Sequence, residues 1–186
     1  MRYKALEIIF WISAIAYAPY AYAQDHFIPC GESIIPLKSI PLPLEIDKRQ
    51  LFEDHNGNDI TTLAEATYTV KAADLNGDGV DEIFISPNFE NSHNYSVWIY
   101  GEDGKQYKQL FSGAVSHAPQ PLRILPSITN HYHDICTTEH WSAIEAYITI
   151  YKFNRAKYSP VECRIEKNTD ERKEPEITPM KCPVYP

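Results

Sequence analysis

The sequence predicts a mainly β protein, either a compact antiparallel β-sandwich or an open β-meander. We expect two propeller-blade-like units stapled by two disulfides, without closure into a propeller. The 186 residues contain short runs rich in β-branched and aromatic residues, separated by Gly, Asn, Asp and Pro. Sustained helical periodicity is lacking. Four cysteines follow a secretory leader, a combination that favours disulfides.

The first 23 residues are predicted to form a signal peptide. Arg2 and Lys4 provide a basic start, an apolar run from Ile8 to Tyr17 follows, and Ala21-Tyr22-Ala23 supplies small residues for cleavage before Gln24. The apolar run is about half of the roughly 20 residues that a membrane-spanning helix needs. We therefore expect export to the periplasm or the extracellular medium, with no membrane span after cleavage.

The charge balance disfavours nucleic acid as a partner. The chain has 17 basic and 25 acidic residues, for a net charge of −8. Removal of the leader takes away two basic residues and one acidic residue, so the mature chain has a net charge of −9. Such a chain lacks a basic surface for phosphates. We expect a protein or another component of the cell envelope as partner.

The mature chain is expected to form a single β domain over residues 24–164. Its first part, residues 24–50, is a proline-rich arm that cannot form a long helix and should lie extended on the domain. A helical turn or two is expected only at Ile60–Ala66. The expected strands are Tyr68–Ala73, Glu82–Ser86, Ser96–Tyr100, Tyr107–Phe111, Leu122–Leu125, Ile144–Phe153 and Lys157–Cys163.

Two stretches of this strand region are alike at an offset of 51 residues. Ile99-Tyr100, a polar turn and Tyr107 correspond to Ile150-Tyr151, a polar turn and Tyr158. This similarity favours two β-meander units. Hairpins of this kind also recur without any repeat, because aromatic residues pair well across strands.

The cysteines are expected to form two bridges. Of the three possible connectivities we prefer Cys163 with Cys182 and Cys30 with Cys136. The first pair would tether the polar, proline-rich tail of residues 165–186, and the second would fix the amino-terminal arm. No Cys-x-x-Cys pair is present, so a zinc ribbon or a thioredoxin-like site has little support.

The segment 74–82 places oxygen donors at alternate positions. Counted from the first residue, positions 1, 3, 5 and 9 have side-chain oxygens and position 7 offers a main-chain carbonyl: Asp74, Asn76, Asp78, Glu82 and Val80. Ca²⁺ takes six to eight hard oxygen ligands, whereas Mg²⁺ demands a stricter octahedron. Three nearby carboxylates repel one another without a cation. The pattern predicts a Ca²⁺ loop; a hairpin turn without an ion is the alternative, because Asn-Gly and Asp-Gly favour turns unaided.

The surroundings of the loop distinguish it from the EF-hand. Position 12 is Ile85 instead of a bidentate Glu, and a strand-like run follows where an EF-hand or a dockerin-type loop would continue into a helix. The stretch Ala73–Ile85 resembles the calcium hairpin of the FG-GAP/VCBS repeat family, which occurs in integrin α-chain propellers and in many secreted bacterial proteins. The resemblance implies the same four side-chain ligands, with Glu82 where Asp is commoner.

The resemblance closely covers about 13 residues, and the following part of the chain loosely resembles small exported bacterial proteins that have one such loop. A single intact loop and a chain of this length do not supply four blades of about 40 to 45 residues, so a closed propeller is not expected. A weaker oxygen pattern at Asp54–Asp59 is a second candidate ion loop, although its Asn56-Gly57 step alone accounts for a turn.

Three functions follow from these features. The first is a non-enzymatic, exported calcium-binding domain that recognises an envelope or extracellular partner, with exposed aromatic residues as the contact. The candidates, some of which should belong to the core, are Trp98, Tyr100, Tyr107, Trp141, Tyr151 and Tyr158. The second is a periplasmic inhibitor or immunity protein that blocks a toxin or a cell-wall hydrolase, because an acidic surface would steer it to a basic target.

The third is a metal- or carboxylate-dependent hydrolase. A metal site would use the polar cluster His131, His133, Asp134 and His140, and a glycosidase would use a carboxylate pair such as Glu139 and Glu145. The chain has no His-Glu-x-x-His motif and no Gly-x-Ser-x-Gly elbow around its serines. We therefore assign no catalytic residue and favour a binding function.

Overall fold

The structure is a computed structural model that describes residues 30, 33–46, 68–87, 94–116, 122–142, 144–168 and 174–183. In these ranges the chain forms strands, turns and irregular segments, and no helix. The strands are β1 (Lys38–Ser39), β2 (Tyr68–Ala73), β3 (Glu82–Pro87), β4 (Asn94–Asp103), β5 (Gln106–Ser116), β6 (Leu122–Thr129), β7 (Tyr132–His140), β8 (Glu145–Phe153), β9 (Tyr158–Lys167) and β10 (Glu176–Met180).

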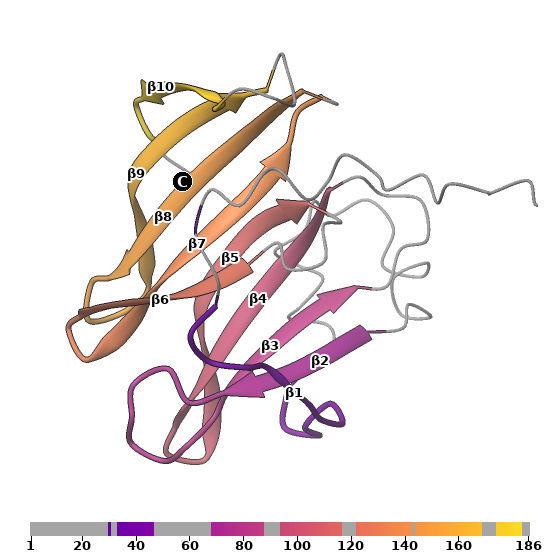
Figure 1. The fold of residues 1–186 in the computed structure, drawn as a ribbon. Coiled ribbons are helices and arrows are strands. Elements are labelled where there is room, and N and C mark those ends of the chain that lie inside the picture. Colours follow the sequence, from indigo (N-terminus) through magenta and orange to yellow (C-terminus); the bar gives the residue numbers. More distant parts are fainter. Residues whose placement is uncertain are drawn as a thin grey trace, which may run out of the picture.

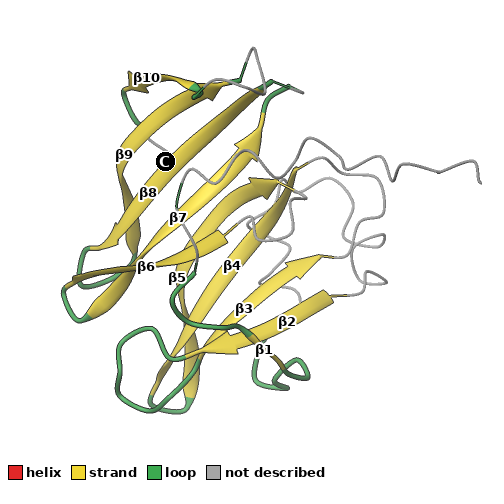
Figure 2. Cartoon of the chain, viewed as in Figure 1, coloured by secondary structure: helices red, strands yellow, loops and turns green. Residues whose placement is uncertain are grey.

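The strands form two five-stranded antiparallel sheets, with the orders β1-β2-β3-β4-β5 and β10-β9-β8-β7-β6. We call these the first and the second sheet. In each sheet every strand pairs with its neighbour along the chain, which is a meander, and neither sheet closes on itself. Figure 1 shows them as two separate blades, and Figure 2 shows that strands dominate the described chain. The predicted antiparallel, non-propeller β fold is confirmed.

A shared apolar core lies between the two sheets. Phe84, Ile99 and Phe111 from the first sheet belong to the same buried cluster as Ile135 and Tyr151 from the second. The rings of Phe111 and Tyr151 meet edge to face with their centroids 4.9 Å apart. Removal of this apolar surface from water is the main term that holds the sheets together.

The arm of residues 33–46 is bonded to both sheets. The amide of Ile34 donates to the carbonyl of Ile124 in β6 at 3.1 Å, and the amide of Ile40 donates to that of Val70 in β2 at 3.1 Å. Ile46 then packs into a second buried cluster, which includes Trp98 and other side chains of the first sheet. The first sheet is therefore covered by the core on one face and by the arm on the other.

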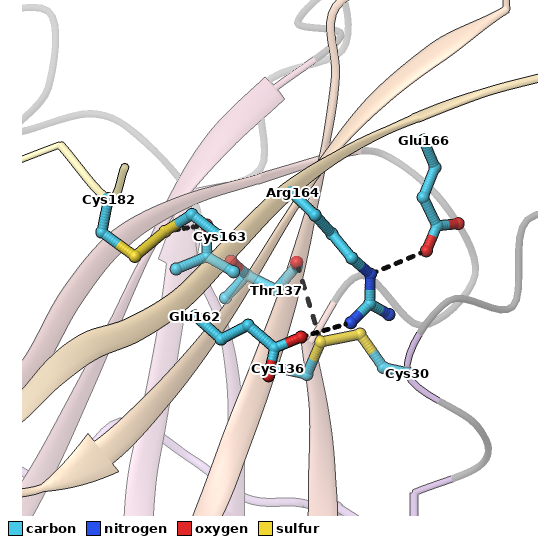
Figure 3. Close-up of polar contacts among 9 residues, drawn as sticks. Cys30, Cys136, Thr137, Glu162, Cys163, Arg164, Glu166 and Cys182 are labelled. Carbon is cyan, nitrogen blue, oxygen red and sulfur yellow. Dashed lines mark hydrogen bonds and ion pairs between the residues drawn. A yellow bond between two sulfur atoms is a disulfide. The ribbon is translucent and has the colours of Figure 1, made fainter. Parts of the chain in front are cut away.

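Both expected disulfides are present, Cys30 with Cys136 and Cys163 with Cys182 (Figure 3). The first attaches the start of the arm to β7, and the second attaches the chain beyond β10 to β9. Figure 3 also shows Arg164 reaching two carboxylates on the same strand, each at 2.9 Å. The predicted pairing is confirmed.

The internal similarity seen in the sequence has a structural counterpart. The β4–β5 pairing shifts register between Ile99 and Tyr100, and the β8–β9 pairing shifts between Ile150 and Tyr151. These irregularities lie at the same 51-residue offset as the two hairpins. Each meander therefore bends its long hairpin at the corresponding place, as expected for two related units.

Two strands, β7 and β10, were not predicted from the sequence. The short apolar runs do not predict β7, whose sequence is mostly polar, although Asp134, Ile135 and Thr137 are buried in the middle of the second sheet. They also do not predict β10, a short strand that contains a proline. It pairs with β9 and forms one edge of the second sheet. The leader and the expected turn at Ile60–Ala66 lie outside the described residues. Among the residues described, no helix has the length and apolar character needed to cross a membrane.

Candidate metal-binding loop

The predicted ion loop connects β2 to β3. Its ends are held by the ladder, in which Ala73 pairs with Glu82. Gly77 and Gly79 have φ values of 75° and 87°, in the left-handed region that glycine adopts most readily. The sequence therefore places its two glycines where the backbone of the loop needs them.

The first residue of the loop organises its backbone. One carboxylate oxygen of Asp74, Oδ1, accepts hydrogen bonds from the amides of Gly77 at 2.7 Å and Asn76 at 3.3 Å. The other, Oδ2, accepts from the amide of Gly79 at 3.0 Å. Desolvation acts to raise the pKa of Asp74, but these backbone bonds outweigh it and lower the pKa. Asp74 is therefore held as a carboxylate at the centre of the turn.

The next two predicted ligands repeat this arrangement. Oδ1 of Asn76 accepts from the amide of Asp78 at 2.9 Å, and Oδ1 of Asp78 accepts from the amide of Val80 at 2.7 Å. Such side chain-to-backbone bonds two residues apart stabilise turns in Asn- and Asp-rich segments. They direct the alternate side chains of the segment back into the loop, while the Val80 side chain is exposed.

Glu82 closes the loop from a buried position. Glu82 is only 3% exposed, and its Oε2 accepts a hydrogen bond from the amide of Leu75 at 2.6 Å. Burial raises the pKa of Glu82 to about 7, and the nearby carboxylates of Asp78 and Asp74 contribute in the same direction. Its charged form is therefore less favourable than that of an ordinary Glu, and a nearby cation would favour it.

Three side-chain oxygens, two from the loop and one from the other sheet, converge on the amide nitrogen of Asn76. Nδ2 lies 2.9 Å from Oδ2 of Asp78, 3.2 Å from the hydroxyl of Tyr132 and 3.4 Å from Oε1 of Glu82. Tyr132 was not a candidate in the sequence, because it is 56 residues from Asn76 and belongs to the other sheet. Only tertiary packing brings it to the loop.

The donor set fits a hard cation. The predicted ligands are carboxylate, amide and carbonyl oxygens, which suit Ca²⁺, and the loop contains no His or Cys that would favour a transition metal. Across the described ranges, no three His, Cys, Asp or Glu side chains are grouped so that they could hold a metal ion. Within the loop, both carboxylate oxygens of Asp74 accept hydrogen bonds from backbone amides.

The four residues of the polar cluster are not gathered at one place. His131 lies in the β6–β7 turn with φ of 73°, so it is not on the same strand face as His133, which belongs to β7. His133 Nδ1 is within 2.8 Å of the carbonyl of Leu125. His140 ends β7, seven residues beyond His133, which corresponds to about 23 Å along a strand.

A serine near the polar cluster and the candidate carboxylate pair, Glu139 and Glu145, lie in structural contacts of the second sheet. Ser127 donates directly to Oδ2 of the buried Asp134 at 2.7 Å, without a histidine between them. Glu145 pairs with Lys167 at 2.7 Å, and Glu139 is a diagonal neighbour on β7 whose pKa is raised by burial. These contacts stabilise the second sheet and define no catalytic arrangement.

The aromatic candidates divide between core and surface. Four of them are buried: Trp98, Tyr100, Tyr151 and Tyr158. Tyr107 is half-buried. Trp141 is 70% exposed and rests edge-on against Tyr147, with ring centroids 5.3 Å apart. The second candidate ion loop, Asp54–Asp59, lies outside the described residues.

Comparison of the chain with protein-family models, curated proteins and solved structures found no match. The function proposed below is therefore based on the residues and geometry of the chain itself.

Proposed function

We propose that this protein is an exported, non-enzymatic β domain that binds Ca²⁺ in the loop 74–82 and recognises an envelope or extracellular partner. The ion would be held by side-chain oxygens of Asp74, Asn76, Asp78 and Glu82 and by the carbonyl of Val80. The likeness of this loop to FG-GAP/VCBS calcium hairpins supports the proposal.

The observation on which the proposal rests is the organisation of the loop. Every second residue directs an oxygen into it, while two left-handed glycines let the backbone turn around those oxygens. Two of the carboxylates are close enough to Glu82 to oppose its ionisation. A divalent cation would remove this repulsion and let all three carboxylates be charged together.

Export is the second part of the proposal. The two disulfides are compatible with an oxidising compartment, and the basic, apolar and small-residue segments of the first 23 residues have the order of a secretory leader. A role at the envelope also agrees with the calcium site, because Ca²⁺ loops of modest affinity fill readily outside the cytosol.

The partner-binding part rests on the hairpin between β7 and β8. Trp141 and Ile144 are both exposed there, at 70% and 44%. Exposed tryptophan is enriched among residues that dominate binding energy at protein interfaces. A protein partner would bury this pair, whether the partner is an envelope component or, in the inhibitor alternative, a basic toxin or hydrolase.

Calorimetric titration of the oxidised mature protein with Ca²⁺ tests the calcium assignment. We expect one ion per chain in the wild type and no binding by Asp78→Ala. Asp81→Ala is the matched control: it removes the same charge from the same loop, but Asp81 is outside the ligand set and pairs with Lys38 at 3.5 Å. Equal binding by both variants, or none by the wild type, contradicts the proposal.

A further inference from the structure

The calcium loop touches the opposite sheet as well as its own. The amide of His133, at the start of β7, donates to the carbonyl of Leu75 at 2.8 Å. Next to it, Nδ2 of Asn76 donates to the hydroxyl of Tyr132 at 3.2 Å. The first two residues of β7 thus contact two consecutive residues of the loop. Below, the β6–β7 turn means residues 130–133, the turn itself and these first two residues of β7.

From these contacts we infer that the β6–β7 turn is part of the calcium site, with Tyr132 as a positioning residue for Asn76 and Glu82. Calcium occupancy and the packing of the two sheets are then coupled. The inference rests on the proposed calcium function and adds a second element of the chain to the site.

The β6–β7 turn is fixed to its own sheet. The ring of Tyr132 lies against that of Phe153, with centroids 4.0 Å apart. The hydroxyl of Tyr158 donates to the carbonyl of His133 at 2.7 Å, and Nδ2 of Asn130 donates to that of Phe153 at 2.7 Å. Bonds from β8 and β9 therefore hold the turn in place, so the Tyr132 hydroxyl is presented to the loop from a preorganised support.

The position of this hydroxyl explains how it would act. It lies 3.2 Å from the same Asn76 nitrogen that contacts Asp78 and Glu82, and Glu82 is the buried end of the ligand set. A hydroxyl at this place holds the Asn76 side chain next to the Asp78 and Glu82 carboxylates before an ion binds. Hydrogen bonds that orient the ligands of a metal ion commonly tune the affinity of its site.

The coupling must work in both directions. If packing of the turn strengthens calcium binding, calcium must stabilise the turn by the same factor. The His133 amide reports this directly, because its hydrogen bond to Leu75 joins the second sheet to the loop. Local opening at the junction would expose this amide to exchange without unfolding either sheet.

The test combines calcium affinity with amide hydrogen exchange. Tyr132→Phe keeps the ring that packs on Phe153 and removes only the hydroxyl. We expect it to bind Ca²⁺ roughly 5- to 10-fold more weakly, as for the loss of one hydrogen bond. Tyr147→Phe is the control, because Tyr147 is half-buried in the same sheet but lies against Trp141, at the far hairpin. Its affinity should equal that of the wild type.

Exchange at the His133 amide is measured with Ca²⁺ and with chelator. Calcium should slow it in the wild type, a result that requires no variant, and should slow it less in Tyr132→Phe at matched saturation. The inference is supported only if both affinity and protection change as stated. Wild-type affinity in Tyr132→Phe, or calcium-independent exchange at His133, overturns the coupling and leaves the calcium function standing. A wild type that binds no Ca²⁺ overturns both.

Discussion

Leu75 offers the sharpest test of how the loop is attached to the fold. It is the second residue of the predicted ion loop, yet its side chain is fully buried, at 0% exposure, in the core between the sheets. Its neighbours there include Phe84 from the first sheet and Ile135 from the second. Truncation to alanine would leave a cavity where the two sheets and the loop meet.

The expected magnitude follows from this burial. Leu→Ala changes at fully buried sites destabilise proteins by about 3 to 5 kcal/mol, through lost transfer free energy and the residual cavity. Because Leu75 belongs to a loop whose backbone can partly collapse into the space, we expect the lower end, about 3 kcal/mol. For a chain of this size that corresponds to a decrease in Tm of roughly 6 to 12 °C.

Urea and thermal unfolding in chelator would measure the loss without any contribution from calcium. Val80→Ala is the control, because Val80 is in the same loop but 42% exposed, and it should change the free energy of unfolding by no more than about 0.5 kcal/mol. A loss below about 1 kcal/mol in Leu75→Ala would refute the claim that this side chain anchors the loop between the sheets.

Four further predictions follow from the site and the fold. Saturation with Ca²⁺ at 100 times Kd should raise the free energy of unfolding by about 2.7 kcal/mol, and Asp74→Ala should abolish this gain; equal Tm values in calcium and chelator would contradict it. Gly79→Ala should destabilise the metal-free protein by about 1 to 2 kcal/mol, because φ there is 87° and an L residue is strained; unchanged urea midpoints would argue against this loop conformation. Replacing Cys30 and Cys136 together by serine should remove about 4 kcal/mol in urea unfolding, since that bridge spans 106 residues; a loss below about 1 kcal/mol would mean that the arm is not held by it. Burial raises the pKa of Glu139, so the folded protein binds this proton more tightly than the unfolded chain, and the resulting stabilisation is lost as the pH rises from the usual Glu value through the folded-state pKa. Glu139→Gln should flatten this decline in chemical unfolding between pH 4 and 8, and an identical slope would exclude Glu139 as its source.

The features that the sequence predicts well are those fixed by local chemistry. The turn-forming residues between 74 and 82 mark the ends of β2 and β3, because glycines and side chain-to-backbone bonds define a loop within one segment. The two disulfides are also predictable, since each bridge joins a proline-rich segment near one end of the chain to the β domain.

The features that escape the sequence depend on contacts between distant segments. β7 is mostly polar although its middle is buried, and Ser127 donates a hydrogen bond to the buried Asp134. Such a partner is invisible in a hydrophobicity pattern. Tyr132 belongs to the loop site only because two sheets pack face to face. No local signal around residue 132 distinguishes it from the other half-buried tyrosines of the chain.

The alternating side-chain directions along the loop connect its local chemistry with the contacts between the two sheets. Odd positions of the loop direct oxygens inward, so the even position occupied by Leu75 is free to point away from them, and in the structure it enters the core between the sheets. The same backbone then offers the Leu75 carbonyl to His133 and the Leu75 amide to Glu82. A cation that tightened the ligands on either side would restrain this residue through both bonds. A single ion would therefore stabilise the junction between the two sheets as well as the hairpin that binds it, and this is why we expect its removal to loosen the β6–β7 turn as well as the loop.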